Sequence, residues 1–316
     1  MFDDIFAGFH TVSMVALVSE DRLWDPGASG WGTAMNIQRG IHWTAVLSAL
    51  CLSTGLCLDH ATPAPLNPRV QLVYQSARSP DLQPVAERVK THQVLEQFGQ
   101  FLLALRLPKD LTIQFDECGA ATRQYQPGGP VTVCYELVDR IEKVAANVKP
   151  ENRALVLVGT IIQAMFHETA TAVFDLLQVP IWGRLDDADD RLAGFLMVEF
   201  GPDLAAQLII GTATFFKESG QTWTGSDFAE ARSPEAQRFF NYLCMAYGSE
   251  PRTFASFGDN KVIGDLTLPI NRAASCAREY EQVRQSFNLR IMPYVDPELL
   301  IQVRSQPWAL VVAAKP

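Results

Sequence analysis

A histidine and a glutamate stand side by side in the most apolar stretch of the chain. His167 and Glu168 lie within ALVLVGTIIQAMFHETATAVFDLL, residues 154–177. In the pattern H-E-x-x-H, two histidines four residues apart on one helix face bind zinc, and the glutamate acts as general base on a metal-bound water. Here Thr171 occupies the second histidine position, and a threonine hydroxyl is a poor zinc ligand. Alone, the dipeptide is a weak signal and favours a core histidine with a hydrogen-bonded glutamate over a metal site.

An acidic run follows at residues 186–190, with the sequence DDADD. On a helix, Asp186 and Asp190 share one face, since they are four residues apart. One carboxylate of such a pair can serve as a third zinc ligand, while the other orients a ligand histidine through its free ring N–H. The alternative is an acidic start of a solvated helix, with Asp187 paired to Arg191. A calcium loop is disfavoured because the glycine and terminal glutamate of an EF-hand are missing.

The number of expected metal ligands is small. His167 and Asp186 give one imidazole and one carboxylate, whereas catalytic zinc sites use three protein ligands. Downstream of the apolar N-terminal segment, the remaining histidines are His60 and His92. His92 lies on a predicted helix and is conceivable as a replacement ligand. Without one, we expect no zinc or only weakly bound zinc.

The elements that must position these residues are mostly helical. The segment at about 152–178 is apolar on every side, which is typical of a helix buried in its domain. Strands at 111–116 and 131–134 flank a Pro-Gly-Gly-Pro turn and predict a β-hairpin. The expected fold is therefore α+β, mostly helical with a small β-hairpin or sheet and a buried active-site helix. Further helices are predicted at about 85–107, 135–148, 190–216, 234–248 and 271–293.

Composition and charge restrict the class of protein. The chain has 316 residues, of which 48% are hydrophobic and 19% charged, as in ordinary globular domains. Its formal net charge of -9 repels phosphate backbones, and no stripe of lysine and arginine counters this. Nucleic-acid binding is therefore not expected.

The N-terminal region predicts export. Residues 35–61 combine a short basic segment with an apolar run of signal-peptide length. Residues 1–34 are interpreted as a doubtful upstream extension, 62–84 as a Pro-, Ser- and Gln-rich linker, and 85–316 as the domain. Cleavage would leave a periplasmic or secreted protein without a stable membrane span. The rival interpretation is a cytosolic leader followed by one membrane anchor at 41–58.

Cysteine usage agrees with export. Cys118, Cys134, Cys244 and Cys276 remain for the mature chain, and four cysteines allow three pairings. Cys118 and Cys134 flank the predicted hairpin and could face each other, which would leave Cys244 to pair with Cys276. Neither pair has C-x-x-C spacing, so a structural zinc site is disfavoured. Four buried free thiols in a cytosolic protein are the alternative.

Several longer stretches resemble a family of bacterial metallopeptidases that is described mainly as an uncharacterised domain. The resemblance covers roughly residues 95–295. The family's H-E-x-G-H-A helix is similar to residues 166–172, and its L-P-V-x-G-R-E-E-D-x-A-D segment is similar to residues 178–190. Its Q-R-F-(F/Y)-N-x-L-C-x-x-Y-G-S-(D/E)-P segment is matched nearly residue for residue by 237–251. Shorter matches lie at 107–113, 117–119, 133–137, 272–276 and 279–280.

The resemblance implies a zincin-like fold, zinc in the family and a disulfide between Cys244 and Cys276. It implies His167 as a metal ligand, Glu168 as the general base, Asp186 as the third ligand and Asp190 as support for His167. The chain departs from the pattern at two of these places. Thr171 replaces the second histidine, and Asp186 is one methylene shorter than the family's glutamate.

Three functions follow from these observations. The first is a pseudopeptidase that keeps the zincin fold to bind a peptide or protein. The second is an active zinc metallopeptidase that hydrolyses peptide bonds with an altered site. The third is a non-enzymatic envelope protein in which the histidine–glutamate pair is structural.

Overall fold

The computed structural model describes residues 66–119, 125–220, 232–259 and 267–305, which belong to one compact unit of the chain. The predicted upstream extension, the signal-like segment and the first residues of the predicted linker lie outside the described residues.

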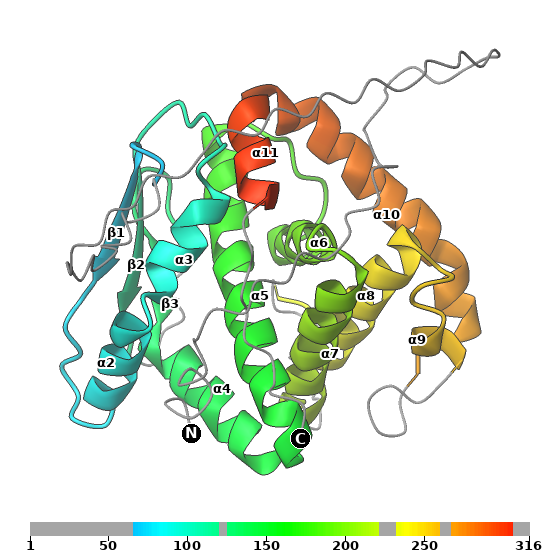
Figure 1. Cartoon of the computed structure of the whole chain (residues 1–316), viewed down its shortest axis with the longest axis horizontal. Helices are drawn as coiled ribbons and strands as arrows, with labels where there is room; N and C mark the ends of the chain where they lie inside the picture. The colour runs from blue at the N-terminus through cyan, green and yellow to red at the C-terminus, as the bar shows by residue number, and fades with distance from the viewer. Residues whose placement is uncertain (1–65, 120–124, 221–231, 260–266, 306–316) are drawn as a thin grey trace, which may run out of the picture. The chain divides into compact units, whose positions relative to one another are not determined.

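A parallel three-stranded sheet forms the N-terminal part (Figure 1). Strands β1 (Val70–Tyr74), β2 (Leu111–Asp116) and β3 (Val131–Cys134) are ordered β1-β2-β3, with Ile113 paired to Val131. The prediction of a hairpin at 111–134 was wrong, because β2 and β3 run in the same direction. The chain must therefore cross over between the end of β2 at Asp116 and the start of β3 at Val131, as parallel strands require.

The prediction of a linker at residues 62–84 also differs from the structure. Residues 62–84 contain β1 and the start of helix α2 (Gln83–Thr91). The polar flanks dominate the composition of this segment, while the five-residue strand is stabilised by pairing with β2, a contact that composition does not reveal.

The helix predicted at 85–107 is divided into two. Helix α2 ends near His92, and α3 (Val94–Phe101) starts after Gln93, whose φ of 50° lies in the left-handed region. A left-handed residue cannot continue a right-handed helix. Helix α4 (Tyr135–Asn147) confirms the helix predicted at 135–148.

Helix α5 (Pro150–Leu176) is the central element and carries His167 (Figure 1). It contacts α4, α6, α7 and β3, and it contributes seventeen buried residues. By length and composition it could cross a membrane, but 83% of its most apolar window is buried inside the fold. The prediction of a buried core helix is confirmed.

Two glycines let α5 and α7 (Pro202–Ser219) approach closely. A Cβ atom on Gly159 would lie 2.4 Å from the Leu208 carbonyl oxygen, and one on Gly211 would lie 1.9 Å from the Leu155 carbonyl oxygen. Helix α6 (Leu185–Val198) precedes α7, and Gly201, with a φ of 89°, separates them where one helical run was predicted.

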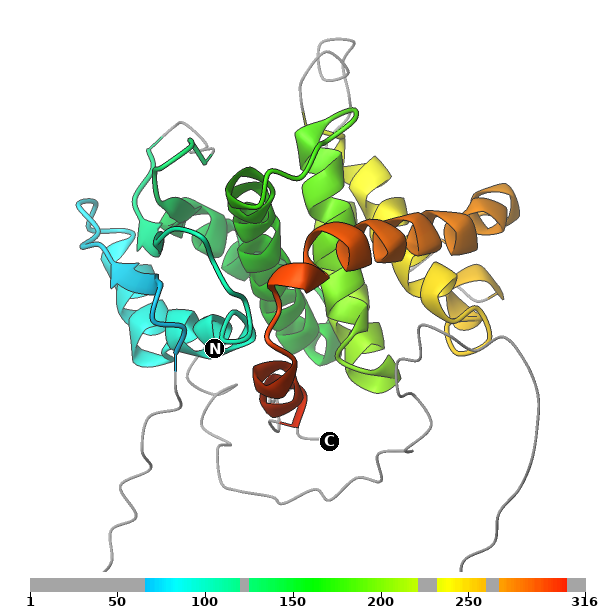
Figure 2. The same ribbon diagram turned by 90° about the horizontal axis from the view of Figure 1, so that it is seen from above.

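The C-terminal part adds helices around α6. Helix α8 (Glu235–Ser249) and helix α10 (Ile270–Arg290) lie side by side, yellow and orange in Figures 1 and 2, and the Cys244–Cys276 disulfide joins them. The short elements α9 (Ser256–Asp259), η2 (Met292–Tyr294) and α11 (Pro297–Ser305) complete the described chain. Mostly helical structure with one small sheet confirms the predicted α+β class.

Candidate metal centre

His167 is a buried side chain held between two carboxylates of helix α6. Its Nδ1 lies 2.9 Å from Asp190 Oδ1, and its Nε2 lies 3.3 Å from Asp186 Oδ1. The two aspartates are one helical turn apart, so both face α5. The structure thus brings together the three residues to which the sequence analysis gave metal-binding or supporting roles.

Asp190 is the most completely bonded carboxylate of the centre. Arg238 of α8 donates two hydrogen bonds to it, of 2.6 and 2.7 Å, and the Tyr242 hydroxyl donates one of 2.9 Å. The amide of Gln163 on α5 donates to the Tyr242 oxygen over 2.8 Å. Arg238 and Tyr242 are not among the residues predicted from the sequence. Their four-residue spacing inside the closely matched 237–251 segment is the signal that could have revealed them.

The charges of this network reinforce one another. Burial alone would raise the pKa of Asp190, but Arg238 and His167 outweigh it and hold that pKa far below its usual range. Burial opposes a charge on the imidazole, yet Asp190 and Asp186 raise the pKa of His167 to about 9. Without a metal, His167 therefore carries a proton at neutral pH, and a metal ion must displace it from Nε2.

Thr171 contacts a further carboxylate, which the sequence analysis did not assign. Its hydroxyl donates a hydrogen bond of 2.7 Å to Asp189 Oδ2. Asp189 is only 2% exposed, and its other oxygen, Oδ1, has no hydrogen-bond partner among the described residues. Burial raises the pKa of Asp189 to about 7. A signal was present in the sequence, because Asp189 belongs to the acidic run at residues 186–190 that also holds Asp186 and Asp190.

These side chains gather atoms that suit a metal ion. Ligand atoms of His167, Asp186 and Asp189 all lie within 4.8 Å of one another. One imidazole nitrogen and two carboxylate oxygens make three protein ligands of the types that zinc accepts. The unpartnered Asp189 Oδ1 is the observation that makes the fit specific, since a buried oxygen without a partner is costly. The residues present therefore fit a divalent cation.

Glu168 lies beside this group on α5 and is half-buried. Burial raises the pKa of its carboxyl, while His167 and Arg232 act in the opposite direction. The Glu168 carboxylate makes no side-chain hydrogen bond to another residue in the described part of the chain. His92 ends α2 and is not among the ligand atoms grouped around His167.

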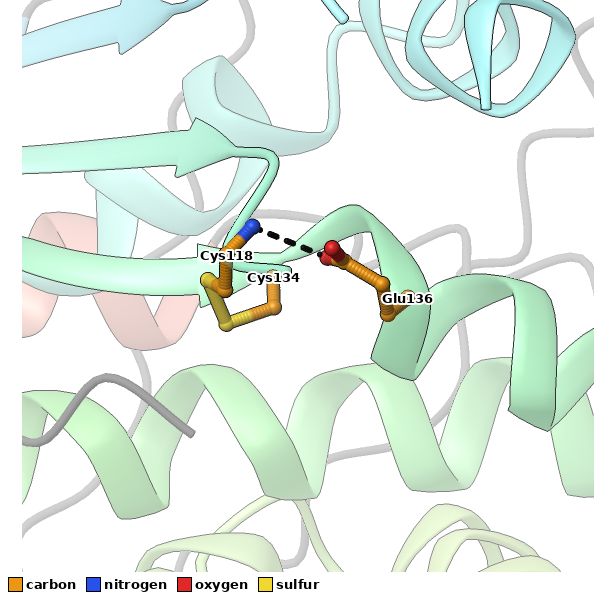
Figure 3. A group of neighbouring side chains, drawn as sticks. All are labelled: Cys118, Cys134 and Glu136. Atoms are coloured by element: carbon orange, nitrogen blue, oxygen red, sulfur yellow. Dashed lines mark hydrogen bonds between the residues drawn. A yellow bond between two sulfur atoms is a disulfide. The ribbon is translucent and has the colours of Figure 1, made fainter. Parts of the chain in front are cut away.

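A second group of metal-ligand types occurs at the end of the sheet, where Cys118, Cys134 and Glu136 meet (Figure 3). Cys118 and Cys134 form a disulfide, as one of the predicted pairings had it, so their sulfurs are not available to a metal. Glu136 accepts backbone N–H hydrogen bonds from Cys118, at 3.1 Å, and Gly119, at 2.6 Å. This group stabilises the turn after β2 and is not a metal centre.

The structure has an α+β fold with a histidine–glutamate pair on a buried helix and carboxylates on the next helix, as the resemblance to metallopeptidases predicts. A family model described as "Putative metallopeptidase" (DUF4344) matches residues 74–289, more than half of the chain, and the chain belongs to this family. No curated protein and no solved structure matches the chain significantly.

Proposed function

We propose that this protein is an exported, metallopeptidase-like protein that binds a peptide or protein segment at the α5–α6 centre and cleaves it little or not at all. The observation that carries this proposal is the side chain of Thr171. It occupies the position of the second ligand histidine, and its hydroxyl is hydrogen-bonded to Asp189. Helix α5 therefore contributes one imidazole where the peptidase pattern has two.

The ligand types favour binding over cleavage even when a metal is present. Bound zinc supplies Lewis acidity, which lowers the pKa of a coordinated water. Asp186 and Asp189 would place two negative charges against the cation, where the family pattern places one carboxylate and two neutral imidazoles. The cation then retains less net charge to acidify water. Glu168 would still be positioned next to His167 to accept a proton.

Peptide or protein as the bound class is supported by the family description, "Putative metallopeptidase", because a peptidase fold binds polypeptide.

Export is supported by the disulfides. Cys118–Cys134 and Cys244–Cys276 indicate an oxidising compartment. Together with the signal-like segment at 35–61, they support a periplasmic or secreted location.

An active metallopeptidase is the second candidate, and Asp189 is the observation that favours it. With Asp189 counted, the centre has three protein ligands, the number that catalytic zinc sites use, and Glu168 is adjacent to them.

One assay pair tests the proposal. Fluorogenic peptide mixtures measure cleavage by the zinc-loaded full chain, and fluorescence anisotropy measures binding of the same peptides. We expect saturable binding with turnover at background level, unchanged in Glu168→Gln. Zinc-dependent cleavage that Glu168→Gln abolishes would establish the second candidate instead. Absence of both binding and cleavage would favour the envelope protein without enzymatic activity.

A further inference from the structure

The two neighbouring aspartates of α6 are satisfied to different degrees. Both are almost completely buried, at 2% exposure for Asp189 and 3% for Asp190. The oxygens of Asp190 accept from Arg238 and Tyr242 and contact His167. Asp189 accepts one hydrogen bond, from Thr171, and its Oδ1 has no partner among the described residues. A buried carboxylate oxygen without a donor is a large unfavourable contribution unless something else binds it.

The Asp189 side chain belongs to a group that already has the composition of a metal site. Its ligand atoms and those of His167 and Asp186 lie within 4.8 Å of one another. Asp190 contacts His167 at Nδ1, and Arg238 fixes Asp190 in turn. Such a carboxylate–histidine contact orients the ring and leaves Nε2 for a metal ion.

We propose that His167 Nε2, Asp186 and Asp189 bind one zinc ion, with Asp189 as the ligand that replaces the missing second imidazole and Thr171 as a residue that positions it. The inference concerns cation binding at the proposed centre and does not depend on whether a peptide binds or is cleaved there.

Thr171 suits this positioning role for two reasons. Its hydroxyl donates to Asp189 Oδ2 and so fixes the carboxylate, while Oδ1 remains available to a cation. Its side chain is also short. A histidine at this position would extend toward the place that Asp189 now occupies, so the two residues replace one ligand together.

The types of the ligand atoms decide which divalent cation the group suits: they are one imidazole nitrogen, from His167, and carboxylate oxygens, from Asp186 and Asp189. Zinc is favoured over calcium or magnesium because an imidazole nitrogen is among the ligands.

Metal binding to the purified full chain tests the proposal directly. The protein is stripped with chelator, dialysed and titrated with zinc by calorimetry, and its metal content is measured by mass spectrometry. We expect about one zinc per chain. Asp189→Asn should weaken zinc binding at least about tenfold, as loss of a ligand does, and Thr171→Val by a smaller factor.

Asp187→Asn is the matched control. It makes the same chemical change on the same helix, two residues away, at a carboxylate that bonds to Ser233 outside the ligand group. We expect its zinc affinity to equal that of the native protein. Zinc binding that is unchanged in Asp189→Asn, or equally weakened in Asp187→Asn, would overturn the proposal.

A second set of variants keeps the test decisive if Asp189→Asn fails to fold. Thr171→His alone would place an imidazole against Asp189, whereas Thr171→His combined with Asp189→Ala gives it room. The double variant should therefore bind zinc more tightly than the sum of the two single effects on zinc affinity predicts. If the two changes have additive effects on zinc affinity, Thr171 and Asp189 do not jointly replace one ligand. A native protein that takes up no zinc, or that prefers calcium, would also overturn the proposal.

The same preparations separate this inference from the proposed function. Peptide anisotropy in the presence of chelator reports peptide binding alone. Peptide binding without zinc uptake would overturn only the metal site, and zinc uptake without peptide binding would overturn only the proposed function.

Discussion

Two places in the described part of the chain bring three metal-ligand side chains together, and in only one of them does a ligand atom lack a bonding partner. At the end of the sheet, Cys118 and Cys134 are joined covalently, and Glu136 accepts two backbone N–H groups (Figure 3). Between α5 and α6, Asp189 is buried with one oxygen unpartnered among the described residues.

The difference shows that proximity of ligand types does not by itself define a metal centre. In the first group, every ligand atom is bonded within the chain, so a cation would have to break existing interactions. In the second, a cation would supply the interaction that is missing. A buried polar atom without a bonding partner is the more informative property, because leaving it unpaired is energetically costly.

The largest expected effect comes from removing the ion pair of Arg238 with Asp190, which holds the second group in place. Arg238→Met removes the cation that neutralises buried Asp190 and should destabilise the fold by about 3–5 kcal/mol. Urea unfolding under non-reducing conditions measures this. The matched control is Arg69→Met, which breaks the exposed pair with Asp110 and should cost less than about 1 kcal/mol. Equal costs for the two changes would show that Asp190 does not depend on Arg238.

The next effect concerns the covalent bond of the first group. Replacing Cys118 and Cys134 by serine opens a loop with a sequence separation of 16 and should lower the free energy of unfolding by about 3 kcal/mol. Because this group is not a metal centre, zinc stoichiometry should stay unchanged. A variant that loses zinc as well as stability would show that the two groups are coupled.

Zinc itself should stabilise the protein through the second group. At a free zinc concentration about 100 times the Kd, binding adds about 2.7 kcal/mol to the free energy of unfolding. Thermal unfolding before and after addition of chelator measures this as a change in Tm, which should be much smaller in Asp189→Asn. Asp187→Asn should respond to zinc as the native protein does. If chelator does not change the Tm of the native protein, the second group does not bind zinc and does not differ from the first in this respect.

The smallest expected effect is at Glu136. Glu136→Ala leaves the backbone N–H groups of Cys118 and Gly119 without their acceptor and should cost about 1 kcal/mol, as loss of a helix cap does. Glu151→Ala, an exposed acidic residue in the first turn of α5, is the control and should be nearly neutral. Chemical denaturation curves compare them. A cost no larger than that of Glu151→Ala would mean that solvent replaces the carboxylate.

Part of the candidate site could be predicted from local spacing. His167 is marked by its place in an apolar helix, and a separation of four residues puts Asp186 and Asp190 on one face of α6. The contacts that Arg238 and Thr171 make could not be predicted in this way. Their contacts with Asp190 and Asp189 join residues 48 and 18 positions apart, and they exist only because three helices pack together.

The sequence by itself determined the elements whose signal is local. The apolar character of α5 on every side fixed its burial, the Pro- and Gly-bounded patterns fixed α4, α8 and α10 to within a few residues, and the cysteine positions limited the disulfides to three pairings. The tertiary structure decided the rest: the parallel direction of β2 and β3, the pairing of β1 and the unpartnered oxygen of Asp189. These features depend on which segments, far apart in the sequence, pack together. A hydrogen bond between two helices, or the lack of one, produces no repeating pattern along the sequence.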